Sequence, residues 1–304
     1  MSVERAAEIL RGGGLVVLPT ETVYGLGADA TNPQAVARLY AAKGRPRFNP
    51  LIAHVPGLAE AAREALLHPL ATELAQVFWP GPLTIVAPRR EDSSVCELAC
   101  AGLATIALRA PAHATARALL AAFAKPIVAP SANRSGHVSA TTAQHAAADL
   151  GGAVDLVLDA GASPIGLEST IVAIDAAGRA TLLRPGAIAR EAIEAIAGPL
   201  AAPAAHAIDA PGMLESHYAP RARLILDAPS APPGGVYLAF GAEAPAGGLS
   251  LSVSGDLTEA AANLYAALRA LDASGAQVIA VAPIPTDGLG EAIRDRLKRA
   301  AAPR

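Results

Sequence analysis

Short apolar segments alternate with segments of helical period along almost the whole chain. Segments such as 15–18 and 83–87 have the length and composition of buried strands, whereas 32–42 and 69–78 have the spacing of helices. Because strands that alternate with helices pack as a sheet covered by helices, the sequence predicts an α/β protein. The pattern restarts at Arg221 after a proline-rich stretch, which predicts a small second α/β domain.

The charge balance excludes one class of partner. The 304 residues carry 24 Lys and Arg against 27 Asp and Glu, with 16 against 17 in residues 1–200 and 8 against 10 in the remainder. A protein that binds long nucleic acid through its phosphates needs a basic excess, so we expect no stable binding of that kind. A charged first helix and the lack of a membrane-length apolar run predict a cytoplasmic protein without membrane contact.

The cysteine content and the absence of common catalytic motifs limit the kinds of reaction that the chain can catalyse. Cys96 and Cys100 are the only cysteines, with no second pair and no nearby histidine cluster to complete a zinc site, so we interpret them as reduced structural residues. The sequence has no Gly-x-Ser-x-Gly elbow, no phosphate-loop Lys-Ser/Thr motif and no His-Glu-x-x-His motif. Covalent catalysis and a metal held by protein ligands are therefore not indicated.

A basic stretch runs from Lys43 to His54 and contains no acidic residue. Gly44 can end the preceding helix in a left-handed turn, and Pro46 disfavours helix at Arg45, so that Lys43 and Arg45 can point the same way. A planar guanidinium beside a compact ammonium group suits a polyphosphate. The alternative that these residues leave open is a solvated basic loop beside a surface histidine.

Further polar groups follow the ends of predicted strands. Thr20 and Thr22 lie just after strand 15–18, in the position where open α/β sheets bind ligands. Arg109 ends an otherwise apolar strand, which indicates either a buried anion partner or a salt bridge at a sheet edge. The segment 130–136 offers hydroxyl and amide groups to phosphate oxygens or a base edge, and is equally typical of an ordinary turn and helix cap.

Stretches in all parts of the chain resemble the threonylcarbamoyl-AMP synthases, the YrdC-like family. They lie, in chain order, at 19–27, 43–54, 105–111, 130–136, 168–172, 183–186 and 211–220. The paired motifs Lys43-x-Arg45 and Ser131-x-Asn133 are specific, and the segment after 211 is similar to the long, two-domain form of the family. The resemblance implies three parts.

The first implied part is a YrdC-like twisted open-sheet domain with a concave active site, at 1–200. A linker or lid follows at 201–220. The third part is a small Rossmann-like α/β domain at 221–304.

The resemblance also implies an activity: formation of threonylcarbamoyl-AMP and pyrophosphate from L-threonine, bicarbonate or CO₂, and ATP. The product supplies the threonylcarbamoyl-adenosine modification of tRNA, so downstream transfer proteins are implied as partners. Mg²⁺ is implied as a companion of ATP, although the sequence shows no dedicated carboxylate set for it. Cations and hydroxyl-rich loops without a nucleophile suit chemistry driven by positioning and charge stabilisation at phosphorus.

Individual residues receive roles from the same resemblance. Lys43 and Arg45 are the expected catalytic pair, and Arg109 is a natural partner for the threonine carboxylate. Tyr218 lies where the linker can fold over the site and exclude water. The residues implied around ATP are Lys43, Arg45, Asn49, Thr105, Ser131, Asn133, Ser139, Arg184 and Tyr218. Those implied around threonine are Thr20 or Thr22, His54, Arg109 and Ser169.

Three other interpretations compete with this one. An RNA-binding module is disfavoured by the even charge balance and the few aromatic residues. A carbamoyl transferase like the hydrogenase-maturation proteins would have zinc-binding cysteine motifs, and this chain has two cysteines in all. The glycine spacing of 25–30 matches a dinucleotide-binding fingerprint, but the next helix begins later, with Asn32 as N-cap and Pro33 at its first position.

Overall fold

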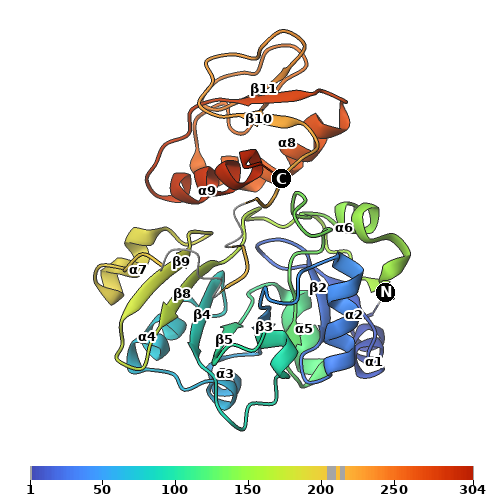
Figure 1. Ribbon diagram of the computed structural model, residues 1–304, viewed down its shortest axis with the longest axis vertical. Coiled ribbons are helices and arrows are strands. Elements are labelled where there is room, and N and C mark those ends of the chain that lie inside the picture. The colour runs from blue at the N-terminus through green and yellow to red at the C-terminus, as the bar shows by residue number, and fades with distance from the viewer. Residues whose placement is uncertain (1, 204–209, 213–215, 304) are drawn as a thin grey trace.

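The computed structural model describes residues 2–203, 210–212 and 216–303. A large N-terminal body with a nine-stranded sheet is followed by a smaller body with a four-stranded sheet. Figure 1 shows the small body standing on one end of the large one, with described parts of the connecting segment between them. The α/β class predicted from the sequence is confirmed, with a mixed sheet in the first body and a second α/β domain after it.

The large sheet is mixed. Its spatial order is β7-β1-β2-β6-β3-β5-β4-β8-β9, with β5 parallel to β3 and antiparallel to β4 on its other side. Its strands are β1 (Val16–Leu18), β2 (Gly25–Asp29), β3 (Ile52–His54), β4 (Leu83–Pro88), β5 (Thr105–Arg109), β6 (Ile127–Val128), β7 (Leu156–Val157), β8 (Thr170–Ile174) and β9 (Ala180–Arg184).

Seven helices of the described chain belong to this body. They are α1 (Val3–Arg11), α2 (Pro33–Lys43), α3 (Leu58–Glu64), α4 (Pro69–Phe78), α5 (Ala114–Phe123), α6 (Ala143–Leu150) and α7 (Arg190–Ala197). Two short 3₁₀ turns, η1 (Glu97–Cys100) and η2 (Gly151–Ala153), complete the connections. The predicted caps of α2 are confirmed: the Asn32 side chain accepts from the backbone of Gln34 and Ala35, and Gly44 ends the helix at φ +62°.

The two faces of the large sheet are covered differently. One face packs along its length against α2, α4, α6 and α7, in a core rich in alanine and leucine. On the other face, α1 and α5 cover the part of the sheet around β7, β1 and β6. Among the described residues, this second face carries only a small apolar cluster over β3, β5, β4 and β8, joined by Ala210 from the connecting segment. That part of the sheet is therefore the floor available for a site.

The segment 25–30 is not a phosphate-binding turn. Gly25–Asp29 is strand β2, pairing antiparallel with both β1 and β6. The glycine at 27 serves close packing, because a Cβ there would lie 2.8 Å from Cδ2 of Leu18. Since the segment runs through the sheet instead of opening a helix, the dinucleotide interpretation is excluded.

The small body is built on parallel strands. Their order is β10-β13-β11-β12, and each neighbouring pair is parallel, as in a Rossmann-like fold. Its elements are β10 (Arg223–Ile225), β11 (Val236–Ala239), β12 (Leu249–Ser250), α8 (Leu257–Ala273), β13 (Val278–Val281) and α9 (Leu289–Ala301). The two-residue strands β7 and β12 were not predicted, because so short a segment carries no periodicity.

Apolar and polar contacts join the two bodies. Val23, Val138 and Leu167 of the large body lie in the same buried cluster as the core of the small one. Arg269 of α8 pairs with Asp149 at 2.7 Å. The predicted boundaries at residues 200 and 220 stay a prediction, since the connecting segment is described only in part. No described helix is long and apolar enough to cross a membrane.

Candidate active site

His54 and Arg109 lie side by side on the open part of the sheet. Strands β3 and β5 are parallel, and their register pairs His54 with Arg109 and Ile52 with Ala107. The two faces of these strands are distinct: Ile52 and Ala107 lie in the cluster beneath the site, while Leu51 and Ala53 enter the main core. The His54 side chain is 2% exposed, so it is not a surface histidine.

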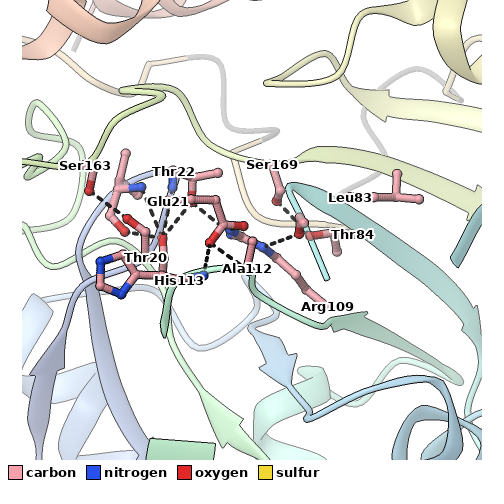
Figure 2. Close-up of polar contacts among 12 residues, drawn as sticks. Thr20, Glu21, Thr22, Leu83, Thr84, Arg109, Ala112, His113, Ser163 and Ser169 are labelled. Atoms are coloured by element: carbon pink, nitrogen blue, oxygen red, sulfur yellow. Dashed lines mark hydrogen bonds and ion pairs between the residues drawn. The ribbon is translucent and has the colours of Figure 1, made fainter. Parts of the chain in front are cut away.

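Arg109 has an internal anion partner. Its guanidinium donates from Nη2 to Oε1 of Glu21 at 2.5 Å and from Nη1 to Oγ1 of Thr22 at 2.9 Å. The other oxygen of Glu21 accepts from the backbone N–H groups of Ala112 and His113, as Figure 2 shows. Although burial opposes ionisation, Arg109 holds the pKa of Glu21 below its usual value. Of the two alternatives, the buried partner is correct, because β5 is an inner strand.

Lys43 and Arg45 are buried beside the open face. Their side chains are only 4% and 8% exposed, so the solvated-loop alternative is wrong. Lys43 Nζ donates to the backbone carbonyls of Ser131 and Asn133. Arg45 donates from Nη2 to Oδ1 of Asn49 at 2.6 Å and to the carbonyl of Pro50 at 2.9 Å. Both cations are thus held in place by neutral acceptors and keep their charge uncompensated by a carboxylate in these contacts.

Burial disfavours the charged forms of Lys43 and Arg45 and lowers their pKa values. It lowers the pKa of Lys43 well below the usual lysine value, with help from the positive charge of Arg45. The pKa of Arg45 falls to about 10 for the same reason, burial. An anion close to both groups would favour their charged states, because an opposite charge at close range favours ionisation. This arrangement suits a phosphate group.

Arg184 approaches the same space from β9. It donates from Nη2 to the carbonyl oxygen and the Oγ of Ser169, at 2.8 and 3.2 Å, and from Nη1 to the carbonyl of Pro211 at 3.1 Å. Burial lowers its pKa as well. Ser169 immediately precedes β8, so Arg184 joins the edge of the sheet to the connecting segment.

The segment after β6 supplies amide and hydroxyl groups. Asn133 donates to the carbonyls of Arg134 and His137 at 2.8 Å each, while its Oδ1 has no partner among the described residues. Ser139 donates to Oε1 of Glu168 at 2.6 Å. This segment therefore contacts Lys43 through the carbonyls of Ser131 and Asn133, and Glu168 through the hydroxyl of Ser139.

Tyr218 covers the site from the connecting segment. It adopts φ +61° and is 1% exposed. Its ring stacks on Tyr265 of α8, with centroids 5.7 Å apart, and the guanidinium of Arg296 of α9 lies 5.1 Å from its centroid. The small body therefore holds this part of the segment over the large one.

Glu168 joins the two bodies beneath Tyr218. Its Oε2 accepts from Tyr265 Oη and from Arg296 Nε, both at 2.8 Å. Burial opposes its ionisation, but the charges of Arg296 and Arg184 lower its pKa to about 2. The carboxylate is therefore a structural anion already committed to an arginine.

These groups enclose a cavity of about 50 Å³. It is lined by Thr22, Val23, Arg45, Ile52, His54, Arg109, Ala129, Pro130, Ser131, Glu168, Ser169, Arg184, Pro211, Gly212, His217 and Tyr218. Lys43 and Asn49 stand directly behind this lining through their contacts with Ser131 and Arg45. Most of the predicted site residues are thus brought together from seven separate stretches of the chain.

Two predicted residues lie elsewhere. Thr105 begins β5 opposite Pro88, at the other end of the strand from Arg109 and outside the cavity lining, so the structure does not support it as a ligand of ATP. Thr20 lies under its loop, where it donates to the carbonyl of Val23 at 2.6 Å and contacts Thr22 Oγ1 at 2.8 Å. Of the two threonines, Thr22 is therefore the one that reaches the cavity.

Four residues of the site were missed from the sequence. They are Glu21, Glu168, His217 and Arg296, of which the first three lie in stretches that were singled out for other residues. An acidic residue between two threonines, at the end of a strand, was a usable signal for Glu21, since Arg109 needed a buried partner. Arg296 carried no such signal, because its partner Glu168 is 128 positions away.

Several buried polar atoms around the cavity have no hydrogen-bond partner in the part of the chain that the structure describes. They include His54 Nδ1, His217 Nδ1, Tyr218 Oη and Asn133 Oδ1. Buried polar groups are normally satisfied, so such a cluster indicates a place for polar ligand atoms. The described residues contain no group of three or more His, Cys, Asp and Glu side chains suited to hold a metal.

The two cavity histidines make stability depend on pH. Burial, followed by the charge of Arg109 for His54 and of Arg45 for His217, lowers both pKa values from 6.5 to about 3. Below pH 6.5 the unfolded chain binds protons that the folded protein does not, so the free energy of unfolding falls as the pH is lowered.

We expect a loss of up to about 1.4 kcal/mol per pH unit for each histidine between pH 6.5 and 5. This window lies above 4.5, the usual pKa that Glu168 has when unfolded, so that carboxylate adds little to the slope there. Urea unfolding at successive pH values measures the trend. A free energy of unfolding that stays flat through this window would contradict the neutral buried state of both rings.

The chain matches known proteins over nearly its whole length. Residues 8–186 match the family model described as "Telomere recombination", and residues 188–302 match "Threonylcarbamoyl-AMP synthase, C-terminal domain". The threonylcarbamoyl-AMP synthases of Pyrococcus abyssi and Bacillus subtilis are 40% and 39% identical to it. They cover 97% and 99% of this chain, which in turn covers 93% of each.

A solved structure agrees with these sequence matches. The crystal structure of P. abyssi Sua5 complexed with L-threonine superposes with a TM-score of 0.90 at 37% identity, covering 98% of this chain and 94% of that one. The fold and site thus define an α/β enzyme with a small buried cavity lined in part by arginine side chains. The chain belongs to the threonylcarbamoyl-AMP synthase family, in its two-domain form, which confirms the resemblance read from the sequence and the activity it implied.

Proposed function

We propose that the cavity beneath the connecting segment is where L-threonine, bicarbonate or CO₂, and ATP are combined. The threonine amine adds to CO₂ and loses a proton, which gives a carbamate. A carbamate oxygen then attacks the α-phosphorus of ATP while the bond to pyrophosphate breaks, leaving threonylcarbamoyl-AMP. No protein nucleophile takes part, so the protein acts by positioning the reactants and stabilising charge.

The observation that carries this proposal is the convergence of buried cations on one small cavity. Lys43, Arg45 and Arg184 surround the side that we assign to the phosphates, because their described contacts are mainly with neutral acceptors. Polar side chains next to these cations hold them in place or add hydrogen-bonding groups beside them, namely those of Asn49, Ser131, Asn133 and Ser139. Tyr218 covers the cavity from the connecting segment. Such groups would stabilise the negative charge that develops on the α-phosphate and the leaving pyrophosphate.

Threonine is assigned to the other side of the cavity. Arg109 spends three of the five N–H donors of a guanidinium on Gly81, Thr22 and Glu21, which leaves donors for the substrate carboxylate. His54 is neutral and its Nδ1 has no partner among the described residues, so it offers a hydrogen bond without charge. Thr22 and Ser169 add hydroxyl groups to the lining of the cavity.

The connecting segment acts as a lid in this proposal. A cavity of about 50 Å³ is several-fold smaller than the roughly 300–1,000 Å³ of sites that hold drug-sized ligands. Pro211, Gly212, His217 and Tyr218 therefore have to move for ATP to enter. Closure afterwards protects the mixed anhydride from water.

The lid predicts the result of truncation. A chain that ends at residue 205 loses Tyr218 and the whole small body, and we expect its turnover to fall by at least about 10²-fold. The full-length variant Tyr218→Ala should lose activity in the same direction, with the free energy of unfolding measured in parallel. Undiminished turnover by both proteins would show that the segment is only a tether.

Mg²⁺ is proposed only as the companion of ATP. The carboxylates nearest the cavity, Glu21 and Glu168, already face Arg109 and Arg296, so the residues present do not fit a metal site of their own. The phosphate oxygens would carry the ion. We also propose a cytoplasmic location and transfer of the product to tRNA-modifying proteins, as the family's activity requires.

The experiment that tests the proposed function is pyrophosphate release by the purified protein with ATP and bicarbonate, before and after addition of L-threonine. We expect release to depend on threonine and to respond less to serine, which lacks the methyl group. Release that is indifferent to threonine would favour the carbamoyl-transfer alternative. Absence of release together with binding of structured RNA would favour the RNA-binding alternative.

A further inference from the structure

Thr84 lies next to the site but outside its cavity lining. It belongs to β4 and is fully buried, and its Oγ1 lies 2.7 Å from the Oγ of Ser169. The register that pairs Ile85 with Leu108 places Thr84 opposite the end of β5, where Arg109 lies. Figure 2 shows Thr84 and Ser169 joined by this contact, beside the group formed by Arg109, Glu21 and Thr22.

The direction of the hydrogen bond between these two hydroxyls follows from their other partners. Ser169 Oγ also lies 3.2 Å from Nη2 of Arg184, and a guanidinium can only donate, so Ser169 accepts there. Among the described residues, Ser169 Oγ is the acceptor that the buried Thr84 hydroxyl can reach. A buried hydroxyl that fails to donate is unfavourable, so Thr84 donates to Ser169.

Two donors therefore point at Ser169 Oγ, and a hydroxyl oxygen has two lone pairs to accept them. Its own hydrogen is left over and has to point away from both Thr84 and Arg184. The cavity is the remaining direction, since Ser169 lines it. We propose that Thr84 is a positioning residue that fixes Ser169 as a hydrogen-bond donor toward the substrate.

A donor at this place selects an oxygen acceptor. Ser169 then recognises a carboxylate-type oxygen of the amino acid, either its carboxylate or the carbamate formed from its amine, and cannot accept from its ammonium group. This inference rests on the proposed assignment of threonine to this side of the cavity. The inference goes beyond that assignment in two ways: it gives the orientation of the Ser169 hydroxyl proton, and it names Thr84 on β4 as the residue that sets this orientation.

The test compares Thr84→Val, which keeps the shape and removes the hydroxyl, with Thr84→Ser, which keeps the hydroxyl. We expect Thr84→Val to raise KM for threonine about tenfold, with KM for ATP within about twofold of the wild-type value. Thr84→Ser should restore KM for threonine. A residue with a merely structural role would change both KM values together, and Thr84→Val with wild-type KM for threonine would overturn the proposal.

A double-mutant cycle with Ser169→Ala supplies the second measurement. If Thr84 acts through Ser169, adding Thr84→Val to Ser169→Ala gives no further rise in KM for threonine. Additive rises would overturn the proposal.

A wild-type enzyme without threonine dependence would instead reject the proposed function. The same cycle measured on urea unfolding then tests the contact between the two hydroxyls, on which the proposed orientation depends, and additive losses overturn it.

Discussion

Replacing Lys43 by methionine is expected to lower kcat/KM for ATP by about 10²–10³-fold. The substitution removes a charge that lies just behind the cavity lining, in contact with the backbone carbonyls of Ser131 and Asn133, on the side where the phosphates are assigned. Methionine keeps the length of the buried stem, so the packing around it is largely retained. The assay is pyrophosphate release at several ATP concentrations, with the free energy of unfolding measured on the same preparations.

Lys125→Met is the matched control for this prediction. Lys125 pairs with Asp29 at 3.3 Å, and its side chain is 52% exposed, so the same chemical change is made outside the cavity. Its turnover should equal that of the wild type. Near-full activity of Lys43→Met would show that the phosphate assignment is wrong, whereas equal losses in both variants would indicate a general effect of charge.

The largest expected effect on stability comes from Arg296. This side chain is fully buried, and it pairs with Glu168 at 2.8 Å across the two bodies. Replacing it by methionine leaves the Glu168 carboxylate buried without its main counter-charge, which should lower the free energy of unfolding by about 3–5 kcal/mol. Turnover should fall as well, because Arg296 also contacts the ring of Tyr218.

Two further variants make this prediction specific. Arg294→Met removes a neighbouring arginine whose pair with Asp227 is much more exposed, and we expect a loss below about 1 kcal/mol. Adding Glu168→Gln to Arg296→Met removes the stranded charge and should recover part of the stability. If Arg296→Met is as stable as the wild type in urea unfolding, the pair does not hold the two bodies together.

Local sequence patterns were sufficient to predict much of the fold. The caps of α2 depend on Asn32, Pro33 and Gly44, which are neighbours in sequence, and each behaves as its own chemistry dictates. The strands predicted at 15–18 and 83–87 correspond to β1 and β4. These features could be predicted because a strand or helix of ordinary length fixes them without reference to distant residues.

The features that could not be predicted depend on contacts between residues that are far apart in the sequence. The basic stretch looks like a solvated loop until Ser131 and Asn133 fold over Lys43. Thr105 was assigned to ATP from its stretch alone, but a strand has two ends, and only the end at Arg109 meets the cavity. The Glu168–Arg296 pair joins residues from different bodies, so no local pattern could have predicted it.

The central claim is that this cavity joins threonine, one carbon from bicarbonate and AMP in a single product. The most direct measurement is mass spectrometry of the nucleotide formed from ATP and L-threonine in ¹³C-labelled bicarbonate. The account predicts a threonylcarbamoyl-AMP adduct that carries one labelled carbon, formed by the wild type and lost in Lys43→Met. Pyrophosphate release that yields only free AMP, or an adduct without label, would contradict it.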